Sequence, residues 1–144
     1  MATDFGTVAA NAFATVGARA RLDKPITIQL TNCPGKPPGT TASTINGTKV
    51  ALGFRRPVNV STTGLANNVA PLDGTSTAKG VGVGLWNTNG TAIALDSETD
   101  FPYDMSDPNN LKVTINFVAD YVITLASVSP GTANTVITVS ARYD

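Results

Sequence analysis

Apolar and polar residues alternate in several separate stretches of this chain of 144 residues. The longest is LKVTINFVADYVITLA, where one face carries Val113, Ile115, Phe117, Ala119 and Tyr121. Successive side chains of a strand point to opposite faces of its sheet, so a period of two predicts a half-buried β-strand. Because helical periodicity is nearly absent, we expect strands to dominate the fold.

The same alternation predicts further strands, and turn residues separate them. These strands cover residues 3–8, 25–33, 48–54 and the chain's ending, where Ile137, Val139, Ala141 and Tyr143 form an apolar face. The stretches GVGVGLW and TAIAL flank the turn NTNG. An Asn-Gly pair tolerates the positive φ of a tight hairpin turn, so we expect these two stretches to pair.

The remaining stretches carry no strand pattern. The Ala-rich stretch VAANAFATVGARARL hints at a helix, but Gly17 interrupts it, and we expect a loop with at most one helical turn. Residues 55–68 read as an irregular or edge region and residues 96–110 as a polar loop. Seven or so strands with turn-rich connections predict an all-β sandwich, and the length predicts a single domain over residues 1–144.

Charge and hydrophobicity narrow the range of partners. Ten basic and ten acidic residues cancel to a net charge of zero, so no basic field is available to bind nucleic acid. No stretch approaches the ~20 apolar residues of a membrane span. The start MATDFGTV lacks a basic region and an apolar core, so we expect that any export signal has been removed or was not included.

The sequence offers little for catalysis. It contains no histidine, the commonest general base and metal ligand, and its single cysteine, Cys33, has no base to activate it. Asp96, Glu98 and Asp100 could grip a calcium ion if they shared a strand face, but a solvated loop is the favoured interpretation. We therefore expect no catalytic residues, no metal and no cofactor, and hence no enzyme.

Two other groups of residues have a structural and a functional interpretation. Gly80, Gly82 and Gly84 alternate within a strand, which favours close packing on one face over a phosphate site. Trp86, Phe101 and Tyr103 could stack on a sugar, although core or rim positions are the favoured interpretation.

The ending of the chain carries the most specific pattern. Tyr143 is penultimate and Gly131 is the fourteenth residue from the end, with alternating apolar residues between them. Before it, FVADYVITLASVSPGTAN resembles the F-x-A-x-Y strand and P-G-x-A-N turn of the pilin subunits of chaperone–usher fimbriae, the type 1 pilus family. GVGVGLWNTNGTAIAL is similar to that family's G-V-G-x-x-L hairpin, and FGTV with PITIQLTNC resembles its early strands.

The resemblance implies an incomplete immunoglobulin-like sandwich, the pilin fold, that lacks its seventh strand. A periplasmic chaperone and then a neighbouring pilin subunit would donate that strand, in the mode known as β-augmentation, during assembly at an outer-membrane usher. It implies a structural subunit of an adhesive fimbrium on the cell surface, exported through the periplasm. The residues implied for the chaperone and donor-strand groove are Gly131, Ile137, Val139, Ala141 and Tyr143.

The start of the chain departs from the family pattern. Such pilins begin with a donor extension and a first strand whose cysteine pairs with the one that Cys33 matches. Neither precedes the second-strand pattern here, so the resemblance implies that Cys33 is a disulfide partner whose mate is missing, through truncation or a misplaced start. The alternatives are the pilin-like domain of a tip adhesin and a stand-alone glycan-binding sandwich.

Overall fold

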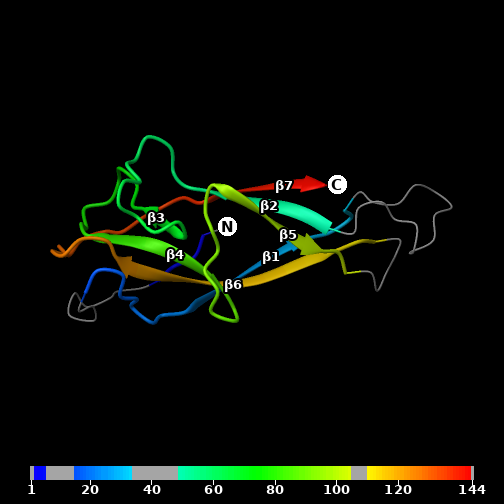
Figure 1. Ribbon diagram of the computed structural model, residues 1–144, viewed down its shortest axis with the longest axis horizontal. Helices are drawn as coiled ribbons and strands as arrows, with labels where there is room; N and C mark the ends of the chain where they lie inside the picture. Colours follow the sequence, from blue (N-terminus) through cyan, green and yellow to red (C-terminus); the bar gives the residue numbers. More distant parts are fainter. Residues whose placement is uncertain (1, 6–14, 34–48, 105–109, 144) are drawn as a thin grey trace.

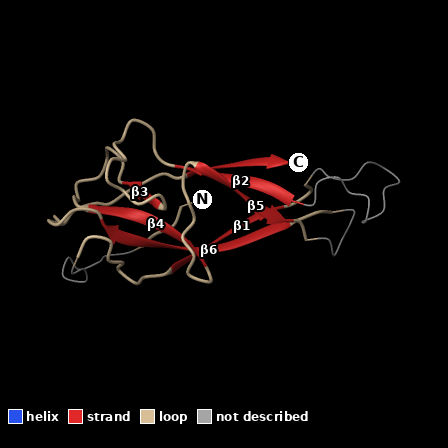
Figure 2. Cartoon of the chain, viewed as in Figure 1, coloured by secondary structure: helices blue, strands red, loops and turns tan. Residues whose placement is uncertain are grey.

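The computed structural model of the protein describes residues 2–5, 15–33, 49–104 and 110–143 (Figure 1). Within these residues, Figure 2 shows strands and loops and no helix. The strands are β1 Lys24–Leu30, β2 Lys49–Arg55, β3 Val69–Pro71, β4 Val81–Asn87, β5 Ser97–Pro102, β6 Val113–Ile123 and β7 Thr138–Tyr143. No helix in the described part has the length and hydrophobicity to span a membrane.

The strands form two antiparallel sheets. One has the order β1-β6-β4-β3 and the other the order β5-β2-β7. In the first sheet Ile26 lies opposite Phe117, and in the second Leu52 lies opposite Ala141. Strands β1 and β7 are therefore both edge strands, one in each sheet, although over a hundred residues separate them in the sequence.

The core lies between the two sheets and comes from the inward faces of their central strands. Phe54 of β2 meets Phe117 of β6 edge to face, with ring centroids 5.6 Å apart. The alternation in β6 is visible in its burial, because Val113, Ile115 and Phe117 are buried while the residues between them are exposed. The prediction of an all-β sandwich is confirmed.

Several local predictions differ from the structure. The polar loop predicted over 96–110 is wrong in its first part, because residues 97–102 form β5 at the edge of a sheet. The hairpin turn after β4 is present, with the Gly90 N–H donating to the Asn87 carbonyl at 2.9 Å, but 91–95 makes only one bridge to β4. Residues 2–5 and 15–22 are not helical or strand segments, and the rest of the predicted strand and Ala-rich stretch lies outside the described residues.

A buried carboxylate fixes the segment that leads into β1. Asp120 of β6 is fully buried and accepts hydrogen bonds from the N–H groups of Arg21 at 2.9 Å and Leu22 at 3.3 Å. The Nε of Arg19 donates to the same carboxylate at 3.3 Å, and its guanidinium lies 3.9 Å from the ring centroid of Trp86. These contacts satisfy a charge that would otherwise be costly to bury, and they set where the β1 edge begins.

The position of the Trp86 ring also explains why residue 84 of β4 is a glycine. A Cβ at Gly84 would collide with the Trp86 ring, which covers this residue on the outer face of the sheet. Gly82 also packs closely, since its Cβ would lie 2.7 Å from the Ala70 carbonyl oxygen. Gly80, predicted within the strand, lies before β4 with a positive φ of 78°.

Candidate functional site

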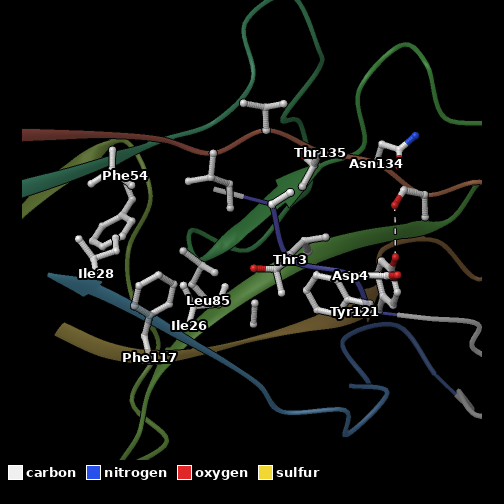
Figure 3. A pocket seen from close by; sticks show the side chains of 18 residues that line it. Thr3, Asp4, Ile26, Ile28, Phe54, Leu85, Phe117, Tyr121, Asn134 and Thr135 are labelled. Carbon is white, nitrogen blue, oxygen red and sulfur yellow. Dashed lines mark hydrogen bonds between the residues drawn. The ribbon is translucent and has the colours of Figure 1, made fainter.

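An apolar groove of about 430 Å³ opens between the β1 edge of one sheet and the β7 edge of the other (Figure 3). Ile26 and Ile28 of β1 form one wall, and residues 133–137 with Val139 form the other. The floor comes from both sheets and consists of Phe54, Val83, Leu85, Phe117 and Ala119. Residues 2–5 lie along the groove, and Figure 3 shows Thr3 between the Phe54 end and the Tyr121 end.

Apolar side chains on both edges lack the cover that a neighbouring strand would give. Val139 is 40% exposed and Tyr143 41% exposed, whereas Leu52 in the adjacent strand β2 is completely buried. In β1 the apolar residues Ile26 and Ile28 are only partly buried although they pack against the core. Contiguous exposed apolar surface beside two sheet edges is typical of an interaction site.

The backbone of each edge is paired on one side. Among the described strands, β7 is hydrogen-bonded to β2 alone and β1 to β6 alone. An edge strand presents a row of N–H and C=O groups that can pair with an added strand. The groove therefore combines apolar side chains with backbone groups that can form a β-ladder.

A set of polar contacts fixes the wall that precedes β7. The Thr132 carbonyl accepts hydrogen bonds from the N–H groups of Thr77 at 3.0 Å and Ala78 at 2.9 Å. The Asn134 carbonyl accepts the Asp73 N–H at 2.8 Å, and the Asn134 N–H donates to the Ser76 hydroxyl at 2.8 Å. We call these contacts between residues 73–78 and 132–134 the polar clasp.

Gly131 permits the close approach at one end of the polar clasp. A Cβ on this residue would lie 2.5 Å from the N atom of Ala78 and 2.5 Å from the Oγ1 of Thr77. These distances are too short for any side chain, so the clasp requires glycine at this position. The sequence prediction placed Gly131 at the groove, whereas here it packs behind the groove wall and does not line it.

At one end of the groove, a hydrogen bond links β6 to the wall formed by residues 133–137. The Tyr121 hydroxyl of β6 donates to the Ala133 carbonyl at 3.2 Å, shown as the dashed line in Figure 3. The Tyr121 ring packs on Phe5, with centroids 4.8 Å apart. Burial, and then the nearby Asp4 carboxylate, raise the pKa of Tyr121, which keeps the hydroxyl protonated as a donor.

At the other end of the two edges, Tyr143 lies beside Cys33, which follows β1. Cys33 is buried and belongs to the core cluster as a free thiol. Burial raises the pKa of the Cys33 thiol, and a side-chain hydrogen bond with Tyr143 partly opposes this change. The thiol is therefore a poor nucleophile in this state.

The structure brings together part of the predicted set. Ile137 and Val139 line the groove, while Ala141 and Tyr143 lie further along β7 and outside the described cavity. Val139, Ala141 and Tyr143 of the predicted apolar face are exposed, and among the described strands β7 pairs with β2 alone. The sequence did not assign Ile26, Ile28 or Phe117 to the groove. Their alternation was visible, but not that β1 is an edge strand beside β6.

The other candidate sites have structural explanations. Asp96 accepts the Arg56 N–H at 3.0 Å, Glu98 pairs with Arg142 at 2.9 Å, and Asp100 pairs with Lys49. In the described part of the chain, no group of three or more His, Cys, Asp or Glu residues is arranged to bind a metal.

The aromatic residues considered for sugar stacking do not share one open face. Tyr103 is buried in the core and Phe101 packs against it. Trp86 lies on the outer face of the other sheet, beneath the Arg19 guanidinium.

Comparisons with solved structures agree with this fold. The chain is similar to an antigen and type I fimbria protein of Burkholderia pseudomallei, with a TM-score of 0.63 and 21% identity over 99% of this chain and 82% of that one. It is also similar to the CupB6 tip adhesin of Pseudomonas aeruginosa, with a TM-score of 0.60 and 16% identity over 95% of this chain and 35% of the adhesin. No curated protein sequence matches the chain.

The family comparison covers almost the whole sequence. The family model described as fimbrial protein matches residues 2–144, a range that includes both edges of the groove and the polar clasp. This match agrees with the resemblance seen in the sequence. The antiparallel sandwich, whose last strand β7 lies at a sheet edge, agrees with it as well. The chain belongs to the fimbrial protein family.

Proposed function

We propose that this chain is a structural subunit of a bacterial fimbria whose groove between β1 and β7 accepts a strand donated by another chain. The observation that carries the proposal is the pair of sheet edges that flank one apolar groove, with Ile28 on one wall and Val139 on the other. An added strand would pair with the β7 backbone and bury alternate side chains against the groove floor.

The free energy available from such an addition is large. Four apolar side chains buried at ~1.5–3 kcal/mol each contribute roughly 6–12 kcal/mol. This is comparable with the ~5–15 kcal/mol that stabilises a typical domain. The donated strand would therefore stabilise the subunit as well as link it to its neighbour.

The proposed partners come from the fimbrial protein family, and the open edge is compatible with them. A periplasmic chaperone supplies the strand first, and the extension of a neighbouring pilin subunit replaces it at the outer-membrane usher. In this scheme residues 1–144 act as one pilin domain, Ile137, Val139 and Ala141 contact the donated strand, and Tyr143 contributes to the chaperone contact. The subunit is exported through the periplasm to the fimbrium and has no enzymatic role.

The gain in stability can be measured with a synthetic donor. A peptide that alternates valine with threonine, capped by lysines for solubility, should raise the thermal midpoint of the purified chain as its concentration increases. A peptide of the same composition in scrambled order is the control. An unchanged midpoint at saturating peptide would contradict strand acceptance.

The chaperone contact has its own test. Tyr143→Ala should reduce the amount of chaperone that co-purifies with the chain, while Thr138→Ala on the same strand should not. Equal recovery with both variants would remove Tyr143 from the proposed contact.

A second candidate is the anchoring domain of a tip adhesin. It is favoured by the similarity of almost all of this chain to about a third of the CupB6 tip adhesin, which carries further sequence beyond the matched part. The coding sequence upstream distinguishes the two: a donor segment with a cysteine supports a subunit, and a separate binding domain supports an adhesin.

A further inference from the structure

An alternating apolar groove leaves the register of an added strand poorly defined. The groove floor offers similar aliphatic and aromatic contacts along its length, from Val83 and Leu85 to Phe117. A strand with alternating apolar residues can slip by two positions and still direct the same kind of side chain inward. A unique register therefore needs a fixed feature at one end of the groove.

The polar clasp determines which backbone groups face the groove. In an extended segment, the N–H and C=O groups of successive residues point to opposite edges. Thr132 and Asn134 direct theirs to residues 73–78, where five of the clasp's backbone contacts lie between 2.8 and 3.0 Å. The intervening residue Ala133 must then present its backbone groups to the groove side.

On that side the Ala133 carbonyl already has a donor. The Tyr121 hydroxyl of β6 reaches it at 3.2 Å, and Figure 3 shows this contact at the far end of the groove from Phe54. The partly buried Phe5 packs on the Tyr121 ring and belongs to the residues around the core. Moving the ring aside would expose both aromatic surfaces to water, which opposes its displacement.

We infer that Tyr121 is the register stop of the groove: its hydroxyl occupies the Ala133 carbonyl, so an added strand pairs from Thr135 toward Tyr143. This role rests on the proposed function and makes Tyr121 a positioning residue. The edge from Thr135 to Tyr143 accommodates a strand of roughly nine residues, about 30 Å at ~3.3 Å per residue.

The stop can be tested by mapping where a bound peptide ends. The probe is the Val/Thr alternating peptide of roughly nine residues, with a photoreactive diazirine leucine at its last apolar position. After irradiation, mass spectrometry locates the cross-links on the protein. We expect a single cluster of cross-links in the native chain. In Tyr121→Phe we expect a second cluster, shifted by two residues toward the end of the groove where Tyr121 lies. Tyr103→Phe removes a tyrosine hydroxyl in the core, at a residue that does not line the groove, so it is the matched control and should keep the single cluster.

The outcomes separate this inference from the proposed function. If the peptide does not bind the native chain, the proposed function fails. If it binds and Tyr121→Phe gives the same single cluster as the native chain, or the native chain gives several, then Tyr121 does not set the register.

A second measurement requires no variant. In the complex of native chain and peptide, amide hydrogen exchange should slow at Thr135 and in β7 but stay unchanged at Ala133. If exchange at Ala133 slowed as much as at Thr135, the added strand would extend past Thr135, and Tyr121 would not be the register stop.

Discussion

The ring of Phe54 in β2 and the ring of Phe117 in β6 meet edge to face, with their planes 77° apart, and join the two sheets beneath the groove. Both rings are almost fully buried, and both also line the cavity. The same pair therefore contributes to the stability of the sandwich and forms part of the floor beneath the space that an added strand would occupy.

Phe117→Ala should lower the free energy of unfolding by about 3–5 kcal/mol, because it removes a buried ring and leaves a cavity between the sheets. Denaturant unfolding measures this change. Thr114→Ala on the exposed face of the same strand is the control and should stay within about 0.5 kcal/mol. A Phe117→Ala loss as small as the control's would mean that this contact does not join the sheets.

Asp120→Ala should cost about 3–5 kcal/mol, because it leaves the Arg19 guanidinium and two backbone N–H groups without their buried partner. Asp23→Asn is the matched control, since Asp23 is the exposed second partner of Arg19 and asparagine tolerates its positive φ. We expect the control to change stability by less than about 1 kcal/mol. Similar losses for both variants would contradict the role given to the buried carboxylate.

Gly131→Ala should destabilise the chain by about 1–3 kcal/mol or more, because its Cβ would overlap the Thr77 and Ala78 backbone. It should also weaken peptide binding, since the polar clasp supports the groove wall. Gly74 lies in the 73–78 segment of the same clasp, but its new Cβ has no atom within 4 Å, so Gly74→Ala should leave both properties unchanged. Denaturant unfolding and peptide titration measure stability and binding in the two variants. Native stability and native affinity in Gly131→Ala would show that the clasp tolerates a side chain at this position.

Alkaline pH should weaken the contact between Tyr121 and Ala133. The pKa of Tyr121 is raised above its ordinary value of 10.0, so its contribution to stability is complete below about pH 10. That contribution is lost as the pH rises through the higher pKa of the folded state, because the phenolate cannot donate. Between about pH 9 and about pH 11, the thermal unfolding midpoint should fall less in Tyr121→Phe than in the native chain. Equal falls would place the alkaline sensitivity elsewhere.

The sequence predicted the strands with a run of alternating apolar residues, and it missed the three-residue strand β3 and the polar strand β5. Strands β1, β2, β4, β6 and β7 show their alternation in the sequence, whereas β5 is almost wholly exposed and reads as a polar loop. Its residues pair with β2 without contributing a regular apolar face, so periodicity carries no signal there.

The candidate site was predictable only on its C-terminal side. Ile137 and Val139 follow from the pattern of the last strand, whereas Ile26 and Ile28 enter the groove because the sheet order makes β1 an edge. Sheet order depends on pairings between distant segments, such as β1 with β6, which local patterns do not determine. The contact of Tyr121 in β6 with Ala133, in the segment before β7, likewise joins distant residues and has no local signature.

The most direct test of the groove as the strand-binding site compares two neighbouring lysine substitutions on β7. Val139 lines the groove, and Thr138 beside it does not, although both are exposed. Titration with the alternating peptide should give a dissociation constant at least about tenfold weaker for Val139→Lys, a change of about 1.4 kcal/mol, and an unchanged one for Thr138→Lys. Native affinity in Val139→Lys, or an equal loss in both variants, would contradict binding in this groove.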